Sequence, residues 1–459
     1  MGARIERDAL GEVSVPEEAY YGAQTQRAAQ NFPVSGVRFP RAFIGALGLV
    51  KKHAATVNGG LGLLAPELAA AVWQAAGEVA EGKLDGQFVL DIFQTGSGTS
   101  TNMNANEVIA GRANEILTGV RGGKAPVHPN DHVNLGQSSN DVIPSVIHIA
   151  ALRAIRHELV PALKALHRAL LEKSAAFRDV AKIGRTHLQD AVPISLGDEI
   201  GGFARQVELG IGRIGGAGGS LEELALGGTA VGNGLNTHPE FAKRVIALVS
   251  AETGCAFREA ENHFEAQSAQ DAAVEASGAL KAIAVSLAKI ANDIRLLASG
   301  PRCGLGEIEL PSLQPGSSIM PGKVNPVIPE VVIQVAAQVI GNDAAITCGG
   351  LGGYLELNTM LPVIAKNLLE TIGLLTSAAS LFAEKCVAGI RANRAACAAF
   401  IEKSLALSTY LAPYIGYDRA AEIAKEAYEK GKTIREVALE KKVLPEEQIR
   451  EIFDKISAR

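Results

Sequence analysis

The chain has 459 residues, more than one ordinary hydrophobic core holds, so two or three domains are expected. Hydrophobic residues make up 47% of the chain and charged residues 20%, and the formal net charge is −5. These values are typical of a globular protein and not of a disordered one. Charges of both signs are interspersed and no basic arm is present, which argues against a nucleic-acid surface.

The amino-terminal residues and the apolar segments also argue against a membrane protein. The amino terminus, MGARIERD, is charged from its fourth residue and does not resemble a signal peptide. The most apolar stretch, VVIQVAAQVI, is interrupted by Gln334 and Gln338. We therefore expect no membrane association.

The cysteines indicate the compartment. Five of them are scattered along the chain: Cys255, Cys303, Cys348, Cys386 and Cys397. No CxxC pair or Cys/His cluster has the spacing of a zinc or iron–sulfur site. We expect reduced thiols in a cytoplasmic protein, without redox or metal chemistry.

Helices are predicted along most of the chain, in three domains. Residues 1–137 form an N-terminal, mostly helical domain, with helices near 41–58 and 66–82 between polar segments. Residues 138–394 form a central domain of long helices, and residues 395–459 form a small helical C-terminal domain. The long helices of the central domain are predicted at 141–177, 198–226, 268–299, 327–346 and 361–388.

The clearest of these helices runs from Ser268 to Ser299, where apolar residues recur at spacings of three and four. Gly300-Pro301 then ends it. Helices of about 25 to 30 residues need partners along their length. A helix bundle, shared between subunits, is the expected arrangement. The glycines at 211–220 mark either a close helix approach or a break.

Four segments depart from the helical pattern and are rich in Ser, Thr and Asn. They are QTGSGTSTNMNANEV (94–108), HPNDHVNLGQSSND (128–141), GRTHLQDAVP (184–193) and GSSIMPGKVNP (316–326). Each lies beside helical sequence, so hydroxyls, amides and helix N-termini could combine with Lys323 to bind a small anion. A P-loop pattern is missing, and a carboxylate or dicarboxylate fits better than phosphate.

Each segment alone also has an ordinary structural explanation. Ser, Thr and Asn gather at helix caps and turns for local reasons. His187 alone could be a hydrogen-bonded residue without catalytic function, and Glu330 an ordinary first-turn carboxylate. His128 and His132 could suggest a metal, but Pro129 opposes a shared helix face. The presence of four such segments in one bundle favours a functional site.

The same segments resemble the fumarase/aspartase superfamily, whose members add to or eliminate across the double bond of fumarate. GSSIMPGKVNP resembles the signature loop of that superfamily, and the resemblance extends from YYGAQTQR to IGYDRAAEIAKEA. Three segments, QTGSGTSTNMN, QSSND and GRTHLQD, are similar to class II fumarases rather than aspartases. LGGTAVGNGLNTHPEF is also similar to class II fumarases, except that Asn233 stands where a threonine is expected.

The resemblance implies a mainly α, three-domain fumarase/aspartase-like fold and the reversible hydration of fumarate to (S)-malate, a reaction of the tricarboxylic acid cycle. It implies metal-free acid/base chemistry through an aci-carboxylate, with no cofactor. The expected assembly is a homotetramer with a shared multi-helix core and active sites built from three subunits.

The resemblance also assigns residues. Ser317 is the expected base, and His187 with Glu330 is expected to handle the water that leaves or attacks. Substrate contacts are implied for Ser97, Gly98, Thr99, Ser138, Ser139, Asn140, Thr186, Ser318, Lys323, Val324 and Asn325. His128, Pro129, Asn130 and Asp131 match a secondary anion site, although a surface turn explains them nearly as well. The glycines and prolines of 316–326 are expected to let that loop close over substrate.

The alternatives are an aspartate ammonia-lyase, then an argininosuccinate or adenylosuccinate lyase, then a silent helical tetramer with a structural role. His187 favours the hydratase, because malate loses hydroxide and needs a proton donor, whereas an ammonium leaving group does not.

Overall fold

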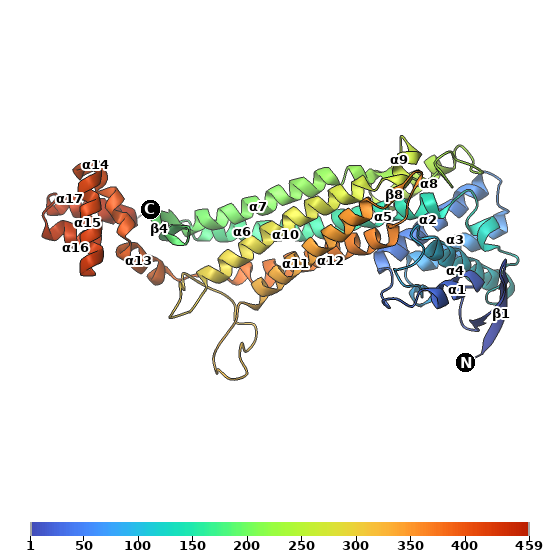
Figure 1. The fold of residues 1–459 in the computed structure, drawn as a ribbon, viewed down its shortest axis with the longest axis horizontal. Coiled ribbons are helices and arrows are strands. Elements are labelled where there is room, and N and C mark those ends of the chain that lie inside the picture. Colours follow the sequence, from blue (N-terminus) through green and yellow to red (C-terminus); the bar gives the residue numbers. More distant parts are fainter. Residues whose placement is uncertain (1, 458–459) are drawn as a thin grey trace. The chain divides into compact units, whose positions relative to one another are not determined.

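The computed structural model describes residues 2–457 and is mainly helical, as predicted (Figure 1). The chain forms two compact units. Unit 1 comprises Met1–Pro161, Gly212–Ala282 and Ala337–Thr376, and unit 2 comprises Ala162–Ile211, Ile283–Ala336 and Ser377–Arg459. The three-domain division at 137 and 394, which follows from sequence composition, stays a prediction.

The elements that begin in unit 1 are mostly helices with short strands. They are β1 (Ala3–Asp8), β2 (Gly11–Pro16), α1 (Ala23–Asn31), α2 (Arg41–Gly60), α3 (Pro66–Ala80), η1 (Asp85–Gln87), α4 (Thr99–Thr118), η2 (Pro129–Val133), α5 (Ser139–Ala154), η3 (Ile155–Leu159), α6 (Val160–Ala176), η4 (Ser220–Glu222), β5 (Glu223–Leu224), α8 (Phe241–Thr253), β6 (Arg258–Glu259), α9 (His263–Ser268), α10 (Asp271–Leu297), β8 (Gly353–Tyr354), β9 (Leu357–Asn358) and α12 (Leu361–Lys385).

The elements that begin in unit 2 include the longest loop and the C-terminal helices. They are β3 (Ala181–Thr186), β4 (Gln189–Ser195), α7 (Leu196–Ala217), β7 (Ile308–Glu309), α11 (Val327–Gly350), η5 (Val387–Gly389), β10 (Arg391–Ala392), α13 (Arg394–Lys403), η6 (Leu405–Tyr410), α14 (Ala412–Ile415), α15 (Tyr417–Lys430), α16 (Ile434–Glu440) and α17 (Glu446–Ser457).

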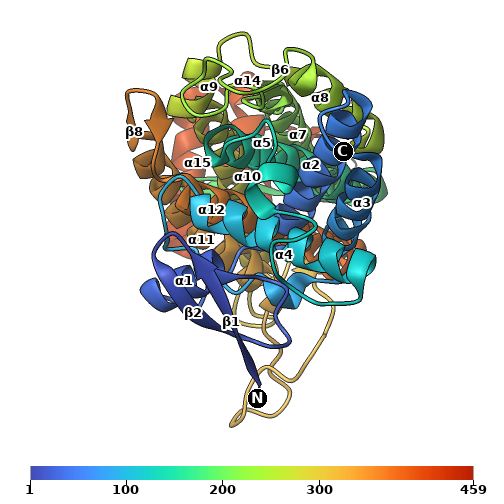
Figure 2. The ribbon, with the colours of Figure 1, turned by 90° about the vertical axis from the view of Figure 1, so that its right-hand side faces the viewer.

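Helices α2 to α5 carry the core of unit 1, with the antiparallel β1–β2 hairpin beside α1 (Figure 2). The closest packing joins α2 to α3. A Cβ atom at Gly48 would lie 2.6 Å from the backbone nitrogen of Ala80, so only glycine allows this approach. Phe43 and Leu47 of α2 are fully buried, which places the apolar face of α2 in the core.

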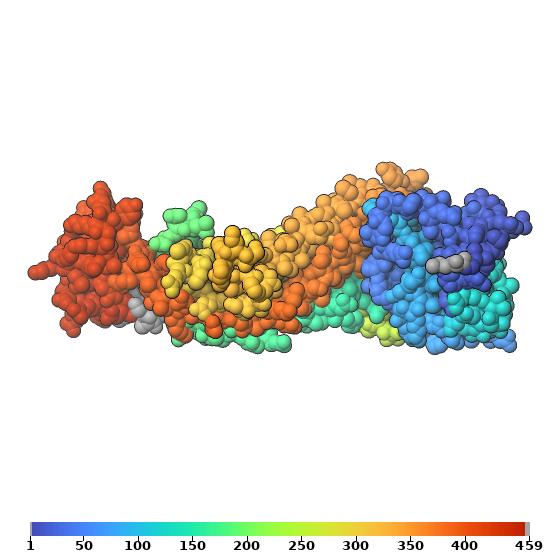
Figure 3. All heavy atoms as spheres, turned by 90° about the horizontal axis from the view of Figure 1, so that it is seen from below, coloured from blue at the N-terminus to red at the C-terminus, as the bar shows by residue number. Residues whose placement is uncertain are grey.

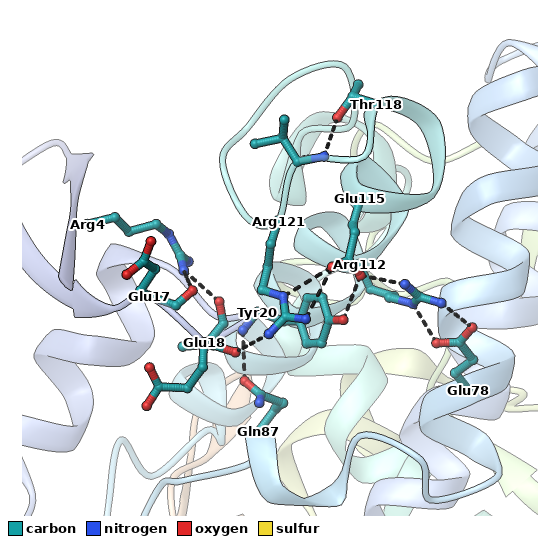
Figure 4. A network of polar contacts seen from close by, with 12 residues as sticks. Arg4, Glu17, Glu18, Tyr20, Glu78, Gln87, Arg112, Glu115, Thr118 and Arg121 are labelled. Carbon is teal, nitrogen blue, oxygen red and sulfur yellow. Dashed lines mark hydrogen bonds and ion pairs between the residues drawn. The ribbon is translucent and has the colours of Figure 1, made fainter. Parts of the chain in front are cut away.

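A polar network fastens the segment before α1 to this core (Figure 4). Arg112 of α4 donates two hydrogen bonds to Glu78 of α3, at 2.7 and 3.0 Å, and also binds Glu115. Tyr20 donates to Glu115 at 2.6 Å, and the Arg121 guanidinium lies 4.3 Å from the Tyr20 ring centre. The hydrogen bonds from Arg112 lower the pKa of Glu78. Both carboxylates therefore stay charged and hold α3, α4 and residue 20 together.

The long helices contact one another through small and polar residues. In unit 1, Ser277 of α10 donates to Asp343 of α11 at 2.7 Å, and Asn342 of α11 donates to Thr371 of α12 at 3.2 Å. In unit 2, a Cβ atom at Gly210 of α7 would lie 3.1 Å from Cγ1 of Ile283 in α10. Polar pairs and a glycine contact thus set the spacing of these helices.

Helix α7 ends within the glycine cluster at 211–220. It stops at Ala217, and Gly218 and Gly219 form a turn, so the helix predicted at 198–226 is too long at its C-terminal end. Gly212, Gly215 and Gly216 would have no described atom within 4 Å of an added Cβ, whereas Gly218 would lie 3.3 Å from Leu152. Contact with α5 therefore accounts for Gly218, whereas no contact with another element of the described chain accounts for Gly212, Gly215 or Gly216.

Helices α11 and α12 are longer and more apolar than the prediction of no membrane-spanning segment assumed. By length and composition alone, the segments Val327–Gly350 and Leu361–Gly389 meet the requirement for crossing a membrane, in spite of Gln334 and Gln338. Helices in the core of a bundle meet the same requirement. Polar residues of α11 also bond to α10 and α12, which is typical of bundle packing.

The C-terminal helices of unit 2, whose surface is red in Figure 3, gather around one buried apolar cluster. Helices α13 and α15 to α17 and the turn η6 contribute most of its buried residues, and Ile183 of β3 is part of the same cluster. The C-terminal helical segment is thus packed onto the strand that leads to Thr186 and His187.

Candidate active site

Residues 94–101 form the N-terminus of α4 and the turn that precedes it. Gln94 Oε1 accepts hydrogen bonds from the backbone N–H and the hydroxyl of Thr101, at 3.0 and 2.9 Å. Gly98 precedes α4 with φ +70°, and a Cβ atom there would lie 3.0 Å from Ile143 of α5. Glycine therefore suits both the left-handed conformation and the close approach of α5. Glycine provides no capping side chain, and Gln94 instead accepts from the Thr101 N–H in the first turn of α4.

The start of α5 is fixed by a capping box. Ser138 Oγ accepts from the Asn140 N–H at 3.2 Å, while Asp141 Oδ1 accepts from the Ser138 N–H at 2.9 Å. Asp141 is fully buried, and its Oδ2 accepts from the N–H groups of Gly227 and Thr229, both at 3.0 Å. Burial raises the pKa of Asp141, against three backbone hydrogen bonds that favour its charged form. One carboxylate thus joins α5 to the 227–229 turn.

Three hydroxyl groups meet between the two helix N-termini. Ser97 Oγ lies 2.7 Å from Thr99 Oγ1, and Thr99 Oγ1 lies 2.7 Å from Ser139 Oγ. Ser97 and Ser139 are buried, and Asn140 donates from Nδ2 to the Ala230 carbonyl at 2.8 Å. Predicted residues from two distant segments are therefore brought together in unit 1. Two helix N-termini beside neutral donors suit an anionic ligand.

The loop 316–326 is organised around its serine. Ser317 Oγ accepts from the backbone N–H groups of Ile319 and Met320, at 3.2 and 2.8 Å. Asn325 donates from Nδ2 to the Gly316 carbonyl at 2.7 Å, and the Gly316 N–H donates to the Lys323 carbonyl at 2.7 Å. Two N–H groups directed at one hydroxyl oxygen favour negative charge on that oxygen.

The rest of this loop faces solvent. Ser318, Lys323 and Val324 are exposed, and Ile319 is 83% exposed. A Cβ atom at Gly316 would lie 2.6 Å from the Lys323 carbonyl oxygen, so glycine is required where the loop closes on itself. Apolar side chains left in solvent on a glycine-rich loop agree with a loop that closes over a ligand, which stays a prediction.

Thr186 and His187 lie at the tip of the β3–β4 hairpin. Thr186 pairs with Gln189, so His187 and Leu188 form its two-residue turn, with φ values of +55° and +60°. Such turns favour glycine and asparagine, and non-glycine residues with positive φ are uncommon. His187 is exposed. A strained, exposed histidine at a hairpin tip is more typical of function than of packing.

Buried ion pairs support the base of this hairpin. The Lys182 ammonium lies 3.0 Å from Glu199 and 3.3 Å from Glu307, and Arg185 donates to Glu307 at 2.9 Å. Glu330 lies in the first turn of α11. Among the described residues, no hydrogen bond joins His187 to Glu330 or to Ser317. The predicted pairing of His187 with Glu330 stays a prediction.

The segment 128–131 forms a single turn. His128 Nδ1 accepts from the N–H groups of Asn130 and Asp131, both at 3.2 Å, and Pro129 is buried. The His128 N–H donates to His132 Nδ1 at 2.9 Å. Nδ1 of His128 therefore acts as an acceptor here, and the nearby Asp131 carboxylate, at 3.3 Å, does not form an ion pair with a protonated ring. Local capping accounts for these contacts, and the secondary anion site stays a prediction.

Sequence reasoning missed two buried residues beside the site. Asp141 completes the Ser-x-x-Asp capping pattern of SSND, a signal that was present in the sequence. Lys51 of α2 donates to Asn134 and Gln137, just before Ser138, and no local pattern in LVKKHAA indicates it.

Comparison with known proteins identifies the protein family to which the chain belongs. Residues 11–341 match the family described as Lyase, and residues 407–456 match the one described as Fumarase C C-terminus. The first match covers more than half of the chain, which therefore belongs to this lyase family. The predicted fumarase/aspartase-like fold is confirmed.

The relatives narrow the class further. The class II fumarate hydratase of Halobacterium salinarum is 58% identical over 451 residues, which cover 98% of this chain and 96% of the relative. The mitochondrial fumarate hydratase of Danio rerio is 54% identical over 450 residues, which cover 98% of this chain and 88% of the relative. The crystal structure of a class II fumarase from Schistosoma mansoni superposes with a TM-score of 0.96 at 41% identity, covering 99% of this chain and 98% of that one.

Proposed function

We propose that this protein is a class II fumarate hydratase, which adds water reversibly to fumarate and forms (S)-malate. One observation carries the proposal: the N-termini of α4 and α5 meet at Thr99 and Ser139, whose hydroxyl oxygens lie 2.7 Å apart. Oriented N–H groups and hydroxyls suit the carboxylates of a small dianion. Relatives that are 53–58% identical and carry this name support the choice of substrate.

Ser317 is the proposed base in the dehydration direction. Its Oγ takes the proton from the carbon next to one carboxylate, and the electron pair moves into that carboxylate to form an aci-carboxylate. The proton is weakly acidic, so donors must already surround the charge that develops. The N–H groups of Ile319 and Met320 favour the alkoxide of Ser317, and Lys323 with Asn325 is proposed to hold the aci-carboxylate.

His187 is the proposed acid. The hydroxyl group on the neighbouring carbon leaves as water after it takes a proton from His187, directly or through a bound water molecule, and the double bond forms. An imidazole is suited to this step because it titrates near neutral pH. Glu330 is proposed to balance its charge. Hydration runs the same steps in reverse.

The remaining motif residues are proposed substrate contacts in the same reaction. Ser97, Thr99, Ser139 and Asn140 would hold one carboxylate through their hydroxyl and amide groups, and the hydroxyls of Thr186 and Ser318 would complete the site. The proposal includes no metal and no organic cofactor, because hydroxyls, amides and an ammonium group bind a carboxylate directly.

A homotetramer with active sites built from three subunits is the proposed assembly. The proposed residues fall in both compact units, with Thr99 and Ser139 in unit 1 and His187 and Ser317 in unit 2. Helix α11 supports the assembly, since apolar residues on it such as Ile340 (47% exposed) would be covered by neighbouring helices. Free thiols, three of them buried, agree with the proposed cytoplasmic location.

The test follows the ultraviolet absorbance of the fumarate double bond. With (S)-malate as the sole substrate, absorbance should rise, and with fumarate it should fall toward the same equilibrium. L-Aspartate is the matched alternative substrate. A rise with aspartate and none with malate would replace the hydratase by an ammonia-lyase, and no change with either would indicate a silent structural protein.

A further inference from the structure

Two lysines of the described chain are almost completely buried, and their surroundings differ. Lys182 is 1% exposed, and its ammonium contacts the carboxylates of Glu199 and Glu307. Lys51 of α2 is 0% exposed, and within the described residues no carboxylate lies at ion-pair distance from it. A buried charge without an ion pair destabilises the folded protein, because no carboxylate offsets the loss of its hydration. A contribution to the stability of the fold therefore does not explain why a lysine is buried at position 51.

The partners of Lys51 lead directly to the site. Its Nζ donates to Asn134 Oδ1 and to Gln137 Oε1, both at 3.0 Å. Asn134 Oδ1 also accepts from Asn102 and Asn106 of α4, both at 3.1 Å. The ammonium group thus joins α2, the helix that starts at Thr99, and the segment that runs into Ser138.

Residues 134–137, which contain both partners of Lys51, form hydrogen bonds within the segment and with α2. Asn134 donates from Nδ2 to the Gln137 carbonyl at 3.0 Å, and Asn58, also on α2, donates to the Leu135 carbonyl at 3.0 Å. Gln137 stands two residues before Ser139, a distance that extended chain covers in about 7 Å. A fixed Gln137 therefore fixes the start of α5.

The charge of Lys51 has a second effect. Lys51 interacts electrostatically with the buried carboxyl group of Asp141, which accepts hydrogen bonds from three backbone N–H groups. In a poorly solvated interior, a positive charge is screened less than at a surface. Lys51 thus adds positive potential behind two helix N-termini that already favour anions.

We propose that Lys51 is a positioning residue of the dicarboxylate site: its buried ammonium fixes the starts of α4 and α5 through Asn134 and Gln137 and favours a doubly charged ligand there. The inference rests on the proposed function, because it takes the ligand to be a four-carbon dicarboxylate.

The test compares Lys51→Met with Lys52→Met. The two lysines are adjacent, but Lys52 pairs with the exposed carboxylate of Glu252, so its replacement should change little. Inhibition constants are measured at pH 6.5, where Lys51 is mostly protonated because burial lowers its pKa to about 7. The inhibitors are succinate, a dianion, and propionate, a monoanion, during turnover of fumarate. Lys51→Met should weaken succinate at least tenfold and propionate by a clearly smaller factor, and Lys52→Met should weaken neither more than twofold.

Two results would overturn the inference: unchanged constants in a folded Lys51→Met protein, or equal weakening of both inhibitors, which indicates a packing defect alone. If Lys51→Met does not fold, Lys51→Gln, which keeps a hydrogen-bond donor, is judged by the same comparison. Wild-type protein without turnover of fumarate or malate would contradict the proposed function instead, so the two failures are distinguishable.

Discussion

At the scale of single residues, the proposed site combines residues that motifs in the sequence predict with residues that they do not. Ser317, Thr99 and Ser139 were predicted from motifs, and the structure adds what surrounds them: backbone N–H groups for the first, helix N-termini for the other two. Lys51 was not predicted, and its hydrogen bond to Asn134 joins residues that are 83 positions apart in the sequence. Contacts of that kind depend on tertiary packing, which no local pattern reports.

Replacement of Ser317 by alanine should remove the base. Because Ser317 is partly exposed and its hydroxyl accepts only loop N–H groups among the described contacts, folding should be preserved. We expect kcat to fall by about 10² to 10⁴, the usual range for an acid–base group. Ser312→Ala, on the exposed chain before the loop, is the control and should keep wild-type kcat. A Ser317→Ala protein with wild-type kcat would assign the base to another residue.

His187→Asn should separate proton transfer from turn geometry. Asparagine tolerates the positive φ of position 187, so the hairpin should keep its shape while the titratable ring is lost. We expect kcat to fall by about 10² to 10⁴ in both directions. Circular dichroism and the elution volume should match the wild type. Full activity in this variant would exclude His187 as the acid.

Lys51 should also give stability a characteristic pH dependence. Burial lowers the pKa of Lys51 from 10.5 to about 7 in the folded protein. The unfolded chain then binds more protons between these values, so stability rises as pH increases from 7 toward 10.5 and is lowest below 7. Relative to Lys51→Met, the urea midpoint of the wild type should therefore increase from pH 6.5 to pH 9. A difference that is constant or decreases with pH would show that the ammonium is not destabilised by burial.

At the scale of elements, the long helices were predictable and the hairpins were not. The helix predicted at 327–346 extends over Val327–Gly350, because apolar periodicity of this length has few alternative structures. The β3–β4 hairpin has His187-Leu188 as its turn, without the glycine or asparagine that would have indicated it. Its geometry is maintained by the buried ion pairs of Lys182 and Glu307 beneath it. Tertiary contacts override local preference there.

Two glycines of α7 offer a direct test of its packing. A Cβ atom at Gly197 would lie 2.4 Å from the Ser174 carbonyl oxygen, whereas Gly202 is exposed and would have no atom within 4 Å. Gly197→Ala should lower the free energy of unfolding by about 1–3 kcal/mol, the usual cost of overpacking. Gly202→Ala should be neutral or stabilising by up to about 1 kcal/mol, because alanine favours helix. Urea unfolding of both variants at one protein concentration decides the point, and equal effects would contradict it.

At the scale of the whole molecule, the predicted residues are distributed over two compact units, and the sequence of one chain does not determine how segments would pair in the proposed tetramer. Thr99 and Ser139 come together within unit 1, while no hydrogen bond joins His187 to Ser317 among the described residues. The motifs predict which residues belong to the site, and that assignment stays a prediction. In the proposed tetramer, the pairing of segments between subunits would depend on surfaces such as the apolar face of α11, which a single sequence does not resolve.

Hybrid assemblies test the proposed three-subunit sites. Ser317→Ala and His187→Asn proteins, each nearly inactive, are mixed, unfolded and refolded together. If the two segments of a site come from different subunits, some sites in the hybrids contain both wild-type groups, and activity should rise well above the sum of the parents.

The matched control mixes Ser317→Ala with Lys323→Ala. Both changes lie in the same loop, so every loop in these hybrids carries one of them and activity should not recover. Equal results for the two mixtures would mean that one chain supplies the whole site.

The row of hydroxyls at Ser97, Thr99 and Ser139 has a consequence for the two directions of the reaction. Either oxygen of each pair can be the donor, because hydroxyl hydrogens rotate. A concerted rotation reverses the polarity of the whole row and turns its end from a donor into an acceptor without moving a heavy atom. The same row of hydroxyls can thereby bind a carboxylate oxygen at one moment and the O–H of water or malate at another.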